Sequence, residues 1–471
     1  FSVHRMVLQT VQQLEQPDVE RNLCVVARWL APRLPLMLFS SIDRNVQLGL
    51  TMLPHGEHMS RLLLHEGKQA FVGPSSEHGT QLQVLLRTLL LQAEFGMEGT
   101  KLPAQMALLV HLLELAHTPQ FSVCFSLEVL LDVTANVGWL FTAAGFLHMS
   151  DQAATLLDKC LAEHDLFQLL NLGNSWQSAL GISPEVVLDA VGYLTVILAF
   201  GGSAGKCERA LNLYDAGLGV IEQLVETGKV EAGRAMSTCL FLVGAHLAVD
   251  PKGHTEASDR IMAMDFAQQS TGMLGAHYLK MQRTHSLMLQ NVWETEALDS
   301  ILAEPTSAAA AHYVSASSLA SDLVCISADH FNCSRYSLRA ARQVMTGQYA
   351  QARLTLESVC ERQAKRMNLG IPACAHADTL FGLAALAAHR EGDVACADKY
   401  LAMSVRQWNL LYYQACGKLS LDHTVGMFFQ AQIMLERGEW VKAAILARQY
   451  IAISNWPDAL RVKHYRFVAL H

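Results

Sequence analysis

Gly347–Ala352 reads GQYAQA, and the same pattern returns as GDVACA at Gly392–Ala397 and as GEWVKA at Gly438–Ala443. The three glycines lie 45 and 46 residues apart. An alanine stands seven residues before each glycine, and another stands five residues after it. These positions are Ala340, Ala385 and Ala431 before the glycines, and Ala352, Ala397 and Ala443 after them. Features that recur in phase at a fixed period indicate a structural repeat, so this stretch decides the fold.

The spacing predicts pairs of antiparallel helices. Glycine ends a helix readily because it adopts the left-handed backbone that a Cβ makes costly. The alanines on either side of each glycine are small enough for two helices to cross closely. A large residue stands eleven positions before each glycine and fills the space between neighbouring hairpins, at Tyr336, Phe381 and Met427. One such hairpin cannot bury its apolar face alone, so we expect the hairpins to stack.

These motifs resemble the tetratricopeptide repeat over about 130 residues. The shared pattern is a small residue, a turn glycine, a large residue two positions later (Tyr349, Val394, Trp440) and an alanine three beyond it. The family's unit is nearer ~34 residues, so the longer period here implies longer helices. The resemblance implies an all-α fold, an α-solenoid of antiparallel helical hairpins. Long-helix versions of the family recur in scaffold subunits of large assemblies, such as the cohesin loader and the anaphase-promoting complex.

Composition agrees with an all-α chain. Of 471 residues, 51% are hydrophobic and 17% are charged, and only Pro372 and Pro457 follow Pro305. We expect three regions: divergent helical hairpins at 1–183, divergent repeats at 184–330 and the clear repeats at 331–471. Ser183 as N-cap and Pro184 in the first turn mark the first border. A helix break is expected at Pro54–Gly56, and a hairpin turn at Gly205 with Ala210 five residues later.

Cysteine usage and hydropathy indicate a soluble protein of a reducing compartment. The 11 cysteines are scattered singly, which is typical of free thiols rather than of a disulfide framework. The longest uncharged run, 190–205, is too short and too rich in glycine to span a bilayer. The first residues, FSVHR, resemble the end left when a mitochondrial presequence is removed, and a truncated chain explains them equally well. Cytoplasm, nucleus and mitochondrial matrix all remain open.

Charge is unevenly distributed along the chain. The formal net charge is −8, yet residues 331–471 carry 17 Lys and Arg against 10 Asp and Glu. The repeats are therefore the basic end of an acidic protein. Either these charges are ordinary solvated helix faces, or they form a basic groove for an acidic peptide or a phosphate backbone.

Three stretches could carry chemistry, and each has a simpler structural explanation. Gly201–Lys206 suggests a phosphate loop, but Phe200 takes the place of the first glycine and Cys207 that of the Ser/Thr. His55, His58 and His65 lack the i, i+4 step that is usual for metal ligands on a helix. Cys374, His376 and Asp378 would converge only in extended backbone. We therefore predict no catalytic residue, no cofactor and no metal site.

The inner face of the repeats is the remaining candidate site. In helical-hairpin solenoids the first helix of each unit lines the concave surface, which places five polar residues on or near it: Ser337, His389, Arg390, Gln432 and Glu436. Polar residues on a concave face are compatible with peptide capture, and equally with a solvated helix.

These features give one leading hypothesis for function and two alternatives. The leading hypothesis is a non-catalytic scaffold that contacts other protein subunits of a multiprotein or ribonucleoprotein assembly. The first alternative is an organellar RNA-binding protein, because Gly205–Tyr214 resembles the second helix of pentatricopeptide repeats. The second and more remote alternative is a nucleotide-binding enzyme that uses Gly201–Lys206.

Overall fold

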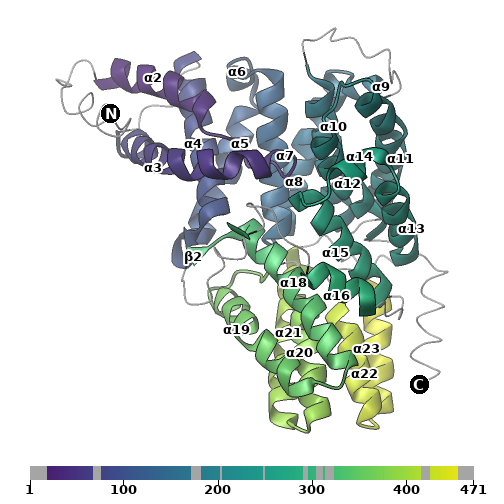
Figure 1. The fold of residues 1–471 in the computed structure, drawn as a ribbon. Helices are drawn as coiled ribbons and strands as arrows, with labels where there is room; N and C mark the ends of the chain where they lie inside the picture. The colour runs from purple at the N-terminus through teal and green to yellow at the C-terminus, as the bar shows by residue number, and fades with distance from the viewer. Residues whose placement is uncertain are drawn as a thin grey trace.

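The protein is all-α in the part of the chain that the structure describes, apart from one pair of two-residue strands (Figure 1). The structure is a computed structural model. It describes residues 19–66, 76–170, 182–201, 204–247, 250–289, 295–303, 311–312, 323–374, 376–414 and 425–453. The predicted fold class is confirmed within these ranges.

Helices α2 to α9 form the N-terminal region. Their bounds are α2 Val19–Leu30, α3 Ile42–Glu66, α4 Ser76–Phe95, α5 Leu102–Ala116, α6 Pro119–Ser122, α7 Leu127–Ala143, α8 Leu147–Glu163 and α9 Leu166–Leu169. Two short 3-10 turns lie among them, η2 at Ala31–Arg33 and η3 at Gly99–Lys101. Strand β1, Met97–Glu98, pairs antiparallel with β2, Leu323–Val324, and so ties this region to the start of the C-terminal repeats.

Helices α10 to α16 form the middle region. Their bounds are α10 Pro184–Phe200, α11 Ala204–Glu226, α12 Ala232–Leu247, α13 Pro251–Met262, α14 Asp265–Gln269, α15 Leu274–Leu289 and α16 Thr295–Ala303. The C-terminal repeats follow as α18 Ile326–Met345, α19 Tyr349–Asn368, α20 Ala377–Glu391, α21 Val394–Gln414, α22 Val425–Glu436 and α23 Trp440–Ile453.

The predicted turn glycines all lie at equivalent bends between two helices. Gly347, Gly392 and Gly438 have φ angles of +72°, +89° and +74°. After each glycine the next N–H reaches back five residues to a helix carbonyl, as Asp393 does to Ala388 at 2.9 Å. This hydrogen bond and the left-handed glycine together form the Schellman end of a helix. The prediction of repeated α-hairpins is therefore confirmed for all three copies.

The predicted small residues lie inside these hairpins. Ala340, Ala352, Ala385, Ala397 and Ala443 have no exposed surface, and Ala431 is buried as well. A further copy has Gly145 at its turn, with φ +80°, between α7 and α8. Its small residues are Gly138 and Ser150, seven before and five after. A Cβ on Gly138 would stand 2.5 Å from Ile197 Cδ1, so the Ile197 side chain of α10 would have to shift to admit a larger residue.

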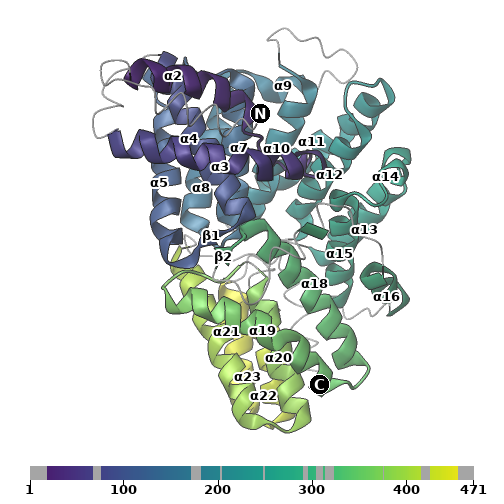
Figure 2. The same cartoon turned by 60° about the vertical axis from the view of Figure 1, so that its left-hand side comes forward.

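The hairpins form a curved array that closes on itself. The first helices of successive hairpins pack in the order α7, α10, α12, α15, α18, α20 and α22. Helix α18 also packs on α7, and α21 packs on α8, which completes a ring of α7, α10, α12, α15 and α18. A hydrogen bond also joins the two ends of the ring. Arg366 of α19 donates to Ala144 O, just after α7, at 3.0 Å, although the two residues are 222 positions apart in the sequence. Figure 2 shows α18 to α23 beneath α5 and α8.

Two local expectations were wrong. Helix α3 runs through Pro54 and Gly56 instead of breaking there. Its packing on α4 keeps it continuous, because Gly56 brings the α3 backbone against Thr88 of α4, where a Cβ would stand 2.5 Å from Thr88 Oγ1. Gly205 lies inside α11 and not at a turn. Helix α10 ends one turn earlier, with Gly201 as its C-cap in right-handed backbone.

The proposed region borders stay predictions. Ser183 does cap α10, since its Oγ accepts from Glu185 N at 3.2 Å, and Pro184 is the first helical residue. One apolar core nevertheless continues from Leu23 to Ile433 across both borders. Among the helices within the described ranges, none is both long and apolar enough to cross a membrane.

A close helix crossing at Ala385 gives a packing prediction. Ala385→Leu places a larger side chain where no surface is free and should lower the free energy of unfolding by about 1–3 kcal/mol. Chemical denaturation measures the change. Ala350→Leu, at the exposed start of α19, is the matched control and should change little. Equal midpoints for Ala385→Leu and the wild type would show that Ala385 is not at a tight crossing.

The hairpin turns give a second prediction, based on a pair of glycines. A Cβ at Gly392 or at Gly205 would meet no other atom, so only backbone conformation distinguishes the two sites. Gly392→Ala forces alanine into left-handed backbone and should cost about 1–2 kcal/mol. Gly205→Ala, in right-handed helix, should stabilise by about 0.4–1 kcal/mol. Thermal melts of both variants test this, and shifts of the same sign would contradict it.

Candidate functional site

Four of the five residues predicted to line the binding face meet in one polar cluster between α20 and α22. Arg390 contacts Glu436 at 2.8 Å, and His389 Nε2 lies 3.4 Å from the same carboxylate. Gln432 Nε2 also donates to Glu436 Oε1, at 3.2 Å. The cluster therefore joins the second hairpin to the third. Whether it also binds a partner stays a prediction.

Ser337 does not share this surface. It is buried in α18, and its hydroxyl donates to Ser334 O at 2.7 Å. Ser337 is therefore not on an open surface, because α18 is covered on several sides. It packs on α4, α7, α15, α16, α19 and α20, which leaves little of it open.

Ion pairs between hairpins use much of the basic charge of the repeats. Arg353 pairs with Glu391 at 2.9 Å, Arg437 with Asp398 at 2.7 Å, and Arg342 with Asp299 of α16 at 3.0 Å. Arg362 contacts the buried carboxylate of Asp329 at 3.1 Å. Positive charge that is already matched by carboxylates is not available to neutralise phosphates. These pairs therefore disfavour a continuous basic groove.

Helix α23 carries the largest exposed apolar side chains of the repeats. Trp440 is 59% exposed, Val441 73% and Ile445 51%. Val441 and Ile445 are four residues apart and so lie on one side of the helix. Ala443 is buried on the opposite side, where α23 packs on α22. Adjacent exposed apolar side chains on one face typically mark an interaction surface.

A second site lies inside the ring of first helices, and it holds a segment of the chain itself. Residues 34–40 belong to the connection between α2 and α3. They are not helical, and they lie inside the ring. Leu36, Met37, Leu38, Phe39 and Ser40 are all buried. Helix α10 is consequently buried on every side, from Val186 to Phe200. The inner surface of the ring is therefore occupied by this non-helical segment, whose end at Phe39–Ser41 forms a turn.

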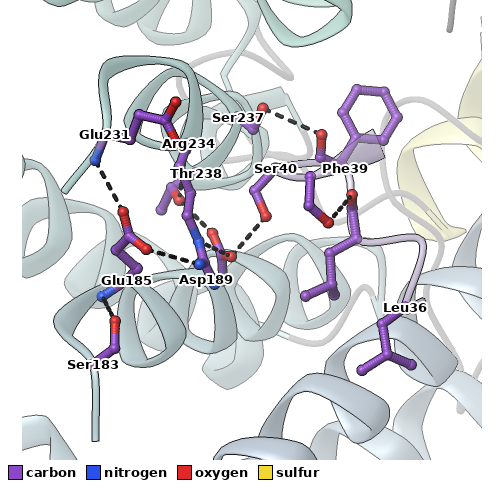
Figure 3. Close-up of polar contacts among 12 residues, drawn as sticks. Leu36, Phe39, Ser40, Ser183, Glu185, Asp189, Glu231, Arg234, Ser237 and Thr238 are labelled. Carbon is purple, nitrogen blue, oxygen red and sulfur yellow. Dashed lines mark hydrogen bonds and ion pairs between the residues drawn. The ribbon is translucent and has the colours of Figure 1, made fainter. Parts of the chain in front are cut away.

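Side chains of the ring and its neighbours bind the backbone of this segment. Phe39 N donates to Tyr193 Oη at 2.7 Å. Ser237 Oγ donates to Phe39 O at 3.4 Å (Figure 3). Arg87 of α4 donates to Leu34 O at 2.7 Å. Phe39 and Ser40 lie in a turn that Ser41 N closes by donating to Leu38 O at 2.9 Å. Because the segment has no helical hydrogen bonds between residues 35 and 38, side chains of the surrounding helices supply part of the partners that its buried backbone needs.

The Phe39 ring sits in an aromatic pocket formed by several helices. Its centroid lies 5.5 Å from Phe241 of α12, 5.6 Å from Tyr278 of α15 and 6.4 Å from Trp139 of α7. The rings of Phe241 and Trp139 are edge-on to it, which is a favourable arrangement for aromatic quadrupoles. One side chain thus contacts three helices of the ring at once.

Asp189 is the charged centre of the site (Figure 3). Its carboxylate accepts from Ser40 Oγ, Thr238 Oγ1 and Arg234 Nε, each at 2.7 Å. Arg234 also pairs with Glu185 at 2.9 Å, and Glu185 accepts from Glu231 N at 3.0 Å. Burial raises the pKa of Asp189, and Arg234 with the two hydroxyls opposes the shift. A buried carboxylate needs such a set of partners, because an isolated one is very costly.

A second carboxylate, Asp132 of α7, lies near the first. Burial, followed by repulsion from Asp189, raises the pKa of Asp132 to about 7, against the opposing influence of Arg234 and Arg87. Burial in turn lowers the pKa of Arg87. The interior of the ring therefore combines two carboxyl groups, Asp189 and Asp132, with two guanidinium groups, Arg234 and Arg87, around an aromatic pocket.

Sequence reasoning did not find these residues. Asp189 is the one charge between Glu185 and Phe200 in an apolar run, and that isolation was the available signal. Ser40 lies 149 residues before it in the chain. No local pattern connects the two positions.

The structure does not support the phosphate-loop interpretation of Gly201–Lys206. Helix α10 precedes this stretch where a phosphate loop requires a strand, and Lys206 pairs with Asp151 of α8. Gly202 and Ser203 lie outside the described residues. The side chain of His65 also lies outside them. Among the groups that are described, no three His, Cys, Asp or Glu side chains are placed to hold a metal ion.

Comparisons with known proteins identify no family. No protein-family model matches the chain, and a search of curated proteins finds no relative. The crystal structure of yeast Tom70 is similar at a TM-score of 0.30 with 11% sequence identity, over 94% of this chain and 95% of that one. A circular tandem repeat protein with a novel repeat topology is similar at 0.20 with 12% identity, over 92% of each chain. At these TM-scores the tetratricopeptide-like assignment rests on the hairpins of the chain itself.

The raised pKa of Asp132 predicts a pH dependence of stability. Between about pH 4 and 7 the folded protein holds a proton that the unfolded chain, with a carboxyl pKa near ~3.9, has lost. The free energy of unfolding should therefore fall as pH rises through this window, by up to about 1.4 kcal/mol per pH unit. Asp132→Asn removes the ionisable group, so this fall in the free energy of unfolding should disappear. At pH 8 the variant should therefore be more stable than the wild type.

Denaturant titrations from pH 5 to 8 give the free energy of unfolding of each protein. The difference between Asp132→Asn and the wild type, followed over pH, is the contribution of Asp132. Glu222→Gln, on the exposed side of α11, is the control and should leave the pH dependence unchanged. Parallel pH curves for Asp132→Asn and the wild type would refute the assignment.

Proposed function

We propose that this protein is a non-catalytic helical-repeat scaffold that docks other proteins as a subunit of a larger multiprotein or ribonucleoprotein assembly. The observation that supports this best is the exposed apolar face of α23, formed by Trp440, Val441 and Ile445. A scaffold acts through surfaces that remain open after its own hairpins have packed, and this face is open among the described residues.

The face lies on the outer side of the array. In α19 the positions equivalent to Val441 and Ile445 are Ala350 and Leu354, and both are exposed although further hairpins follow. In α21 they are Ala395 and Lys399, which are exposed as well. The outer faces of the second helices therefore stay uncovered along the repeats, and α23 is the most apolar of them.

The partner that this face fits is an amphipathic helix with acidic residues beside its apolar stripe. A ridge formed by Val441 and Ile445 packs into the groove of another helix. Exposed Arg448 lies one turn beyond Ile445 and would pair with a carboxylate on the partner, whereas Lys442 already pairs with Glu439 at 2.6 Å.

RNA is a weaker candidate for the partner. Several arginines of the repeats are matched by carboxylates, as in Arg353–Glu391 and Arg437–Asp398. Arginines that are already paired in this way contribute little to binding a phosphate backbone. The cysteines of the described part are free thiols, which supports a reducing compartment, whether cytoplasm, nucleus or mitochondrial matrix.

Photo-crosslinking from α23 in native cells tests the proposal. A photoreactive residue at position 441 should crosslink to a segment of another protein that reads as an amphipathic helix with acidic flanks. A second probe, a photoreactive residue at position 448, should capture the same partner. Val441→Asp combined with Ile445→Asp should lower the yield of that crosslink at least tenfold. The melting midpoint should hardly change, because both side chains are exposed.

A photoreactive residue at Val123, which is exposed beside α6, is the matched control and should not capture this partner. Crosslinks from position 441 to RNA, to a second copy of the chain, to residues 454–471 or to nothing would each overturn the proposal.

A further inference from the structure

Two ionisable groups on α4 and α7 lie within electrostatic reach of each other without being bonded. Arg87 of α4 is 8% exposed, and its Nε has no hydrogen-bond partner among the described residues. The buried Oδ1 of Asp132 on α7 has no such partner either. The two helices pack on each other. Burial dominates the pKa of both groups, and each group also acts on the pKa of the other. A donor and an acceptor are therefore close together, each with a hydrogen bond still to make.

We propose that Arg87 and Asp132 form a salt bridge between α4 and α7 that is present at high pH and absent at low pH. When the carboxyl group of Asp132 is protonated, Arg87 binds the backbone of Leu34, whose carbonyl accepts from Nη1 at 2.7 Å. When Asp132 loses its proton, its Oδ1 accepts a hydrogen bond from Arg87 Nε as well. The contact between the two helices thus has two states. It does not involve the outer face of α23, so this inference and the proposed function stand or fall separately.

The surroundings of Asp132 place its titration near neutral pH. Burial, and then repulsion from Asp189, raise the pKa of Asp132 to about 7. Arg234 and Arg87 oppose this rise, and Glu128 adds to it. These charged groups come from α10, α12, α4 and α7 itself. Asp132 therefore changes its charge in a range of pH where an ordinary carboxyl group, with a pKa of about 3.9, is fully ionised.

Arg87 is the group that responds, because the other guanidinium near Asp132 is already engaged. Arg234 binds Asp189 at 2.7 Å and Glu185 at 2.9 Å (Figure 3). Arg87, by contrast, has a backbone carbonyl and no carboxylate as its partner among the described residues. A buried charge without a paired ion is costly. This cost favours pairing of Arg87 with Asp132 as soon as the carboxylate forms.

The proton of Asp132 exchanges with solvent while the protein stays folded. Its Oδ1 is buried, but the residue as a whole is partly exposed. Asp189, in comparison, is only 2% exposed and has three side-chain donors that hold its carboxylate. Of the two carboxyl groups, Asp132 is therefore the one whose charge follows the pH of the surroundings.

The salt bridge offsets only part of the cost of ionising Asp132. A complete offset would return the pKa of Asp132 to its ordinary value of about 3.9, whereas it lies near 7. Removal of Arg87 should therefore harm the folded protein more where Asp132 is charged than where it is neutral. This dependence on pH distinguishes a switched salt bridge from two unrelated residues of the core.

An NMR titration of the full wild-type chain tests the proposal directly. The carboxyl resonance of Asp132 should titrate with a midpoint near pH 7, and the Nε–H resonance of Arg87 should move with the same midpoint. Asp132→Asn and Arg87→Lys serve only to assign the two signals. An Nε–H resonance that does not follow Asp132, or a carboxyl midpoint below about pH 5, would overturn the proposal.

Denaturant titrations at pH 5 and pH 8.5 give a second test. At pH 8.5, Arg87→Met should raise the unfolding equilibrium constant about fivefold more in the wild type than in Asp132→Asn, because only the wild type loses a salt bridge. At pH 5 the two increases should be equal. Arg61→Met, on the exposed side of α3, is the matched control and should act equally in both backgrounds at both pH values. Equal effects of Arg87→Met at pH 8.5 would contradict the proposal, and the NMR titration decides if Arg87→Met does not fold.

Discussion

The structure depends on filling the centre of a closed ring of helices. Successive first helices from α7 to α18 curve until α18 meets α7, so their inner faces converge on one axis. Left empty, that axis would be a cavity lined by aromatic rings, and cavities of this kind destabilise proteins in proportion to their volume. Phe39 fills it from a distant part of the chain and contacts three helices of the ring.

The polar groups at this axis impose a second constraint. Asp189 and Asp132 lie where charge is costly, and Arg234 and Arg87 offset part of that cost. Buried ionic groups contribute little net stability, but a group that loses its partner is strongly destabilising. The arrangement therefore selects one position for the entering segment, in which Ser40 meets Asp189, and disfavours a shifted register in which the hydroxyl would miss the carboxylate.

The surfaces of the array divide into those that join hairpins and those that remain open. The turn end of the repeats carries ion pairs such as Arg390–Glu436, which link neighbouring hairpins. The outer faces of the second helices are open, and on α23 they are apolar. In the proposed scaffold function, the open apolar face of Trp440, Val441 and Ile445 is the surface that meets a partner.

The repeat architecture was predictable from the sequence because its causes are local. Gly347, Gly392 and Gly438 adopt a backbone that other residues avoid, and the small size of Ala340 or Ala385 sets how closely two helices approach. The copy at Gly145 was missed because Gly138 and Ser150 replace the alanines. The candidate binding residues were only partly predictable, since Ser337 points into packed structure. Closure of the ring and its occupation by Leu34–Ser41 were decided by the tertiary structure alone. Both depend on contacts between residues far apart in the sequence, such as Ser40 with Asp189 (149 positions) and Arg366 with Ala144 (222 positions). The sequence around either partner contains no pattern that predicts such a contact.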